Sequence, residues 1–175
     1  MPIVNFDSLP DDARVWVFGS DRPLDPEATR RLLAVVDAHL AQWAAHGAPL
    51  ASARDWRDDR FLTVAVDQRT VGASGCSIDT LFRQLQTLER ELALSIVGGS
   101  RVFYRDDAGA VQSTDRAGFT ALAERGTVTP ETRVYDLTVQ TLGDWRRGFE
   151  LRASQSWHGA LMPLGGGSGA MGSQR

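Results

Sequence analysis

The chain has 175 residues, enough for one sizeable hydrophobic core or for a domain of about 100 residues with a smaller module. Its 42% hydrophobic and 23% charged residues are ordinary for a soluble globular protein. Nineteen basic against twenty-two acidic side chains leave a net charge of −3, so no nucleic-acid partner is expected. All the basic residues are arginines, which excludes Schiff-base, P-loop and general-base lysine chemistry.

The cysteine count and the apolar runs indicate the compartment. A single cysteine cannot form an intramolecular disulfide, and no secretory leader pattern is present in residues 1–20. The longest apolar runs, such as 63–66, are far shorter than the ~20 residues that cross a bilayer. We therefore expect a cytoplasmic protein with no membrane span.

The first half of the chain opens with a lead-in at residues 1–13 and a β-branched, aromatic strand at 14–18. A helix follows, with Asp25 as a good N-cap and Pro26 at its first position, and it is expected to end at Gly47. Its apolar side chains recur at helical spacing: Leu32, Leu33, Val36, Leu40 and Trp43.

A second group of elements completes the predicted first domain. Residues 51–56 and 61–66 are expected to form two antiparallel strands. A small-residue loop at 71–79 leads into a second helix, and residues 101–105 form a further strand. The β-α-β-β-α-β order is typical of ferredoxin-like α+β folds, so we predict such a domain over residues 14–105.

The pattern changes over residues 106–162, where a short strand, a helix at 116–124 and two further short strands predict a small C-terminal α/β module. This part resembles the GYF-type adaptor domains, although it lacks their Gly-Tyr-Phe core. The likeness covers about forty residues and is carried by Gly109, Leu122, Gly126-Thr127-Val128, Pro130 to Val134 and Trp145. The glycine-rich residues 163–175 are expected to form a flexible tail.

Cys76 is the strongest candidate for a functional residue. A thiol at a helix start is stabilised as thiolate by unsatisfied backbone N–H groups and the helix dipole. Ser74, Gly75 and the N–H groups of Ser77 and Ile78 could line an anion pocket around it. Alternatively, Cys76 packs as a small buried hydrophobe while Ser77 or Asp79 caps the helix.

A catalytic thiol needs a base, and the chain offers three histidines. His39 lies inside the first predicted helix, and His46 at the end of that helix is also suited to stabilising its dipole. His158, beside Trp157, lies in an irregular stretch, where the tryptophan could equally anchor the chain end. No pair of histidine or cysteine residues has metal-ligand spacing, so neither a metal nor another cofactor is expected.

Several segments together are similar to a family of bacterial proteins whose activity is not established. They are Arg14-Val15-Trp16, Gln42-Trp43, His46-Gly47, Pro49-Leu50, the run Ala73-Ser74-Gly75-Cys76-Ser77-Ile78-Asp79, and Ser156-Trp157-His158. Members are sometimes labelled ABC transporter ATPases, yet this chain has no phosphate-binding P-loop. The resemblance implies one shared site formed by Trp43, His46, Ser74, Gly75, Cys76, Ser77, Asp79, Trp157 and His158.

Two functions fit these features. The favoured one is a binding or regulatory module that holds an unknown small molecule or protein partner at the Cys76 loop. The alternative is a thiol-dependent enzyme with Cys76 as nucleophile and His46 or His158 as its base.

Overall fold

The computed structural model describes residues 3–45, 48–69 and 75–163. The helices are α1 (Pro26–Ala41), α2 (Gly75–Leu92), α3 (Arg116–Glu124) and α4 (Leu142–Gly148), with short 3₁₀ turns η1 (Phe6–Ser8), η2 (Ala153–Gln155) and η3 (Trp157–Leu161). The strands are β1 (Arg14–Gly19), β2 (Ala44–Ala45), β3 (Ala48–Pro49), β4 (Ser52–Arg57), β5 (Phe61–Val66), β6 (Val102–Arg105), β7 (Val111–Thr114), β8 (Arg133–Tyr135) and β9 (Glu150–Arg152).

The first sheet is antiparallel and has the order β1-β5-β4. Its central strand β5 is buried along its whole length, because its side chains enter two different cores. Leu62 and Val64 point to the helical side, whereas Phe61 and Ala65 point to the opposite side. This alternation makes the sheet the middle layer of the molecule.

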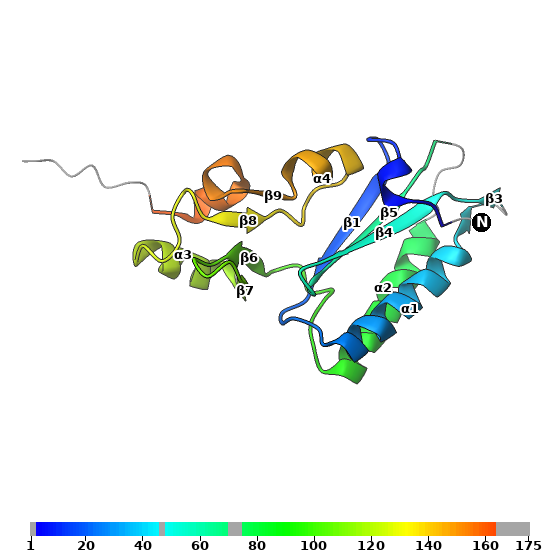
Figure 1. Ribbon diagram of the computed structural model, residues 1–175, viewed down its shortest axis with the longest axis horizontal. Helices are drawn as coiled ribbons and strands as arrows, with labels where there is room; N and C mark the ends of the chain where they lie inside the picture. Colours follow the sequence, from blue (N-terminus) through cyan, green and yellow to red (C-terminus); the bar gives the residue numbers. More distant parts are fainter. Residues whose placement is uncertain (1–2, 46–47, 70–74, 164–175) are drawn as a thin grey trace, which may run out of the picture.

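Helices α1 and α2 cover one face of this sheet (Figure 1). Asp25 caps α1 by accepting hydrogen bonds from the backbone N–H groups of Glu27 and Ala28 at 2.9 and 2.8 Å. The core-facing side chains recur every three or four residues in both helices. They are Leu32, Val36 and Leu40 in α1, and Leu81, Leu85 and Leu88 in α2.

The second sheet has the order β7-β6-β8-β9 and lies beyond the other face of the first sheet (Figure 1). Strands β6 and β7 form a hairpin whose turn contains Gly109 at φ 82°, a backbone conformation that suits glycine. Phe103 of β6 packs against Phe61 of β5 with ring centroids 5.1 Å apart. One hydrophobic cluster therefore joins the two sheets.

The predicted mixed α+β class is confirmed, but the predicted ferredoxin-like order is not. The strand expected at 101–105 does not extend the first sheet; as β6 it pairs with β7 and β8 in the second. Beside β1 runs an irregular segment instead, where the Val15 N–H donates to the Gln140 carbonyl at 3.0 Å and Arg14 bridges to Thr141. A local hairpin with a short loop costs less chain entropy than a return to the first sheet.

Two helix boundaries also differ from the sequence prediction. Helix α1 ends at Ala41, not at Gly47, and the following residues form the small β2-β3 hairpin. Helix α2 begins at Gly75, so the second half of the predicted 71–79 loop is helical. Ile78 packs against the core and extends the leucine stripe backwards by three residues, which favours this earlier start.

Candidate functional site

Cys76 lies in the first turn of α2, next to Gly75 and Ser77. Asp79, in the next turn, is exposed, and its backbone carbonyl accepts a hydrogen bond from Arg83 Nε at 3.3 Å. Ser74 and His46, which the sequence also assigned to this site, lie outside the described residues. The described part of the predicted site is therefore a helix start with an exposed carboxylate one turn later.

Trp43 is part of the first hydrophobic core. It follows α1, is only 2% exposed, and packs between Trp16 of β1 and His39 of α1, with ring centroids 5.9 and 5.2 Å away. Its backbone carbonyl accepts from the Leu50 N–H at 3.1 Å, which closes the chain around the β2-β3 hairpin. These contacts make Trp43 a packing residue at the end of the helical layer.

Trp157 and His158 belong to η3 in the C-terminal part of the chain. His158 is fully buried, stacks on Trp157 at 3.8 Å and shares a hydrogen bond of 2.6 Å between its Nδ1 and Ser156 Oγ. Trp157 Nε1 donates to Asp136 Oδ1 at 3.2 Å, and the Arg116 guanidinium lies 5.2 Å from the Trp157 ring. Burial, the largest effect, lowers the pKa of His158 to about 4.

These predicted site residues do not converge on one pocket. The start of α2 and the end of α1 lie at one end of the long axis of the molecule, whereas η3 lies towards the other end (Figure 1). His158 is therefore far from the first turn of α2 and is fully buried. It is not positioned to take a proton from Cys76.

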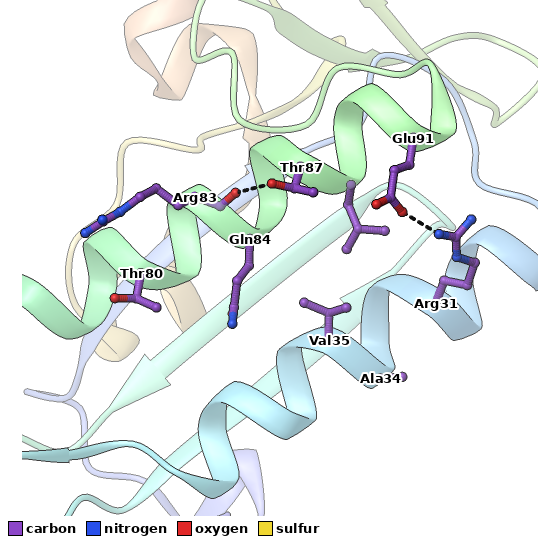
Figure 2. A pocket seen from close by; sticks show the side chains of 9 residues that line it. Arg31, Ala34, Val35, Thr80, Arg83, Gln84, Thr87 and Glu91 are labelled. Atoms are coloured by element: carbon purple, nitrogen blue, oxygen red, sulfur yellow. Dashed lines mark hydrogen bonds and ion pairs between the residues drawn. The ribbon is translucent and has the colours of Figure 1, made fainter.

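A groove of about 620 Å³ lies between α1 and α2, on the side turned away from the sheet (Figure 2). Its floor is apolar and is formed by Ala34 and Val35 of α1 and Leu88 of α2. The amide of Gln84 points from α2 towards α1 across the middle of the groove. Thr80 lines it near the start of α2, four residues after Cys76. The groove thus leads towards the helical turn that contains Cys76.

The two ends of the groove differ in charge. At one end Arg31 and Glu91 form an ion pair of 2.5 Å that links α1 to α2. Towards the other end lies Arg83, an exposed cation that forms no ion pair with any residue the structure describes. One end is therefore neutralised, and the other carries a positive charge that is open to an anionic group.

A cluster of polar side chains around Arg105 links the two sheets, and its contacts stabilise the fold. Arg105 of β6 forms ion pairs of 3.4 Å with Asp58, in the β4-β5 turn, and with Glu150 of β9, and it donates to the Tyr135 hydroxyl. Burial and the two nearby carboxylates raise the pKa of Tyr135 above its ordinary value.

Within the described ranges, no group of three histidine, cysteine or acidic residues could hold a metal ion.

The groove residues Arg31, Val35 and Thr87 were missed by the sequence interpretation. A weak signal exists: Val35 is apolar but lies beside the Leu32-Val36-Leu40 stripe, and Thr80 and Thr87 are small residues seven apart on α2. Such residues are ordinary on helix surfaces. These residues line one groove only because α1 and α2 pack side by side in the folded protein.

Comparisons of this chain with family models, curated proteins and solved structures find no match. The likeness of residues 73–79 to a bacterial family stays a prediction. The structure adds that no helix in its described ranges has the length and apolar character needed to cross a membrane.

Proposed function

We propose that this chain is a non-catalytic binding module whose partner site is the groove between α1 and α2, extending to the first turn of α2 where Cys76 lies. The observation that supports it is the groove itself, with an apolar floor, one amide directed into it and one unneutralised arginine. Apolar concavities with a few directed polar groups are the usual form of a binding site.

The thiol-enzyme alternative has less support. His158 is buried at the other end of the molecule, and its pKa is lowered by burial, so it is suited to packing as a neutral ring. His46, the other base that the sequence suggested, lies outside the described residues, and His39 packs edge-on against Trp43. We therefore propose a binding function in preference to thiol catalysis.

A selection experiment tests this function. A random peptide library is panned on the purified chain and counter-selected on the Thr87→Arg variant, in which a long cation would obstruct the groove. The matched control is Gln86→Arg, because Gln86 is exposed on the same helix but does not line the groove. Peptides that bind the parent chain and the control but not Thr87→Arg are expected; a set of binders that ignores Thr87→Arg would refute the proposed site.

The single thiol gives an independent readout of how far the site extends. A groove-bound peptide should slow the alkylation of Cys76 by iodoacetamide, because the bound partner would cover the first turn of α2. Saturating peptide that leaves the alkylation rate unchanged would confine the site to the groove and remove Cys76 from it.

A further inference from the structure

The α1-α2 groove is long and open, a shape that favours an elongated occupant of which only one face is buried. Its lining residues on α2 run from Thr80 to Glu91 at intervals of three or four, a straight stripe of about 16 Å at 1.5 Å per residue. Most of the lining side chains, including Ala34, Gln84 and Thr87, are exposed, so the groove would leave much of a small molecule in water. A helix, by contrast, buries only one stripe.

The side chains along the groove also suit close helix packing. Ala34, Val35 and Thr87 are small, so the backbone of a third helix could approach the pair closely, as ridges enter grooves in helix-helix packing. Leu88, 5% exposed, and Val35, partly buried, supply the apolar floor against which an aliphatic stripe would pack. These features fit helix-in-groove recognition.

The charges that line the groove indicate which charged group the partner carries. Arg31 and Glu91 already neutralise each other, whereas Arg83 donates a hydrogen bond to the Asp79 backbone carbonyl and forms no ion pair within the described ranges. A partner carboxylate near Arg83 would form a charge-assisted hydrogen bond that a neutral helix could not. A cationic side chain at the same place would be repelled.

We infer that the partner in this groove is an amphipathic protein helix of about eleven residues, with an aliphatic stripe facing Val35 and Leu88 and a carboxylate facing Arg83. This inference rests on the proposed function and gives the partner's chemistry. Specificity comes from Arg83, and the contact area comes from the side chains of both helices that line the groove.

The test uses hydrocarbon-stapled helical peptides of about twelve residues, each with a leucine stripe and a single glutamate near one end. Parallel series carry glutamine or lysine in its place, and an unstapled peptide of scrambled sequence serves as a control. Affinity for the full chain and for its Arg83→Glu, Thr87→Arg and Gln86→Arg variants is measured by fluorescence anisotropy, and circular dichroism verifies that each variant folds.

The glutamate helix should bind the parent chain and the Gln86→Arg control equally, and bind Thr87→Arg at least about tenfold more weakly. Arg83→Glu should weaken the glutamate helix by about fivefold and improve the lysine helix, with little effect on the glutamine helix. This reciprocal exchange would not arise from a general loss of stability.

Other outcomes separate the inference from the proposed function. Equal binding of the scrambled peptide, or indifference of the whole charge series to Arg83→Glu, would overturn the helix inference while selected groove-binding peptides still support the function. Binding of dodecanoate in a Thr87-dependent way, without any helix binding, would assign the groove to a small amphiphile and overturn the inference as well. Failure of selected peptides and stapled helices alike would refute both.

Discussion

At the scale of single residues, burial makes His158 a neutral packing residue and not a catalytic base. Its ring is enclosed, stacked on Trp157, and bonded through Nδ1 to Ser156. Loss of hydration lowers its pKa to about 4; the charge of Asp136 opposes this shift and that of Arg116 adds to it. The unfolded chain takes up a proton near pH 6.5, whereas the folded chain resists it until about pH 4.

This difference predicts an acid-sensitive stability. The contribution of neutral His158 is fully present above pH 6.5, falls as the pH decreases towards 4, and is then constant, with a total on the order of 3 kcal/mol. A His158→Phe variant keeps an aromatic ring but cannot titrate, so its free energy of unfolding should fall less over this interval. Urea titrations between pH 4 and 7 measure both slopes; parallel slopes would contradict the role of His158.

Residue by residue, the sequence indicated part of the candidate site. It placed Cys76 at a helix start, because small residues precede a strong leucine stripe, and α2 does begin at Gly75. It could not tell that Trp43 and His158 are enclosed, since an aromatic ring near an element end can pack or bind. That choice depends on neighbours such as Trp16 and Phe119, which are distant in the sequence.

At the scale of elements, β6 explains the largest error in the predicted fold. The alternation of Val102, Phe103 and Tyr104 correctly predicts a strand, and both of its faces are buried. A strand buried on both faces carries no pattern that specifies its neighbour in a sheet. The nearby Gly109 turn decides the pairing by bringing β7 alongside β6.

The close approach of β1 to β6 gives a prediction about Gly19, at the end of β1. A Cβ atom there would lie 2.6 Å from Phe103 Cζ and 2.9 Å from Leu137 Cδ2. Gly19→Ala should therefore destabilise the protein by about 1–3 kcal/mol through overpacking. Gly99→Ala is the control, because nothing described lies within 4 Å of its Cβ position. Thermal denaturation compares them; equal melting temperatures would show that the two sheets separate easily.

At the scale of the whole molecule, one aromatic cluster unites the two sheets. Phe61 of β5 contacts Phe103, Tyr135 and Phe149 with ring centroids 5.1, 4.5 and 5.3 Å apart. Arg57 adds a cation–π contact with Trp145 at 4.3 Å. Because these residues come from both sheets and from α4, neither sheet buries its side of this cluster without the other.

We therefore expect the full chain to unfold in one cooperative transition. Tryptophan fluorescence and far-ultraviolet circular dichroism, recorded over the same urea titration, should give coincident curves. Two separated transitions would contradict the shared core, because they would show that the first sheet with its helices is stable while the second sheet is unfolded.

Mapping a selected peptide onto the chain with amide NMR shifts tests whether the α1-α2 groove is the binding site. The peptide should perturb the amides of Ala34, Val35, Thr87 and Leu88, which line the groove, and leave those around Trp157 unchanged. Shift changes confined to the amides around Trp157 and η3, with the α1 and α2 amides unchanged, would contradict binding in the groove and place the binding surface in the C-terminal part of the molecule.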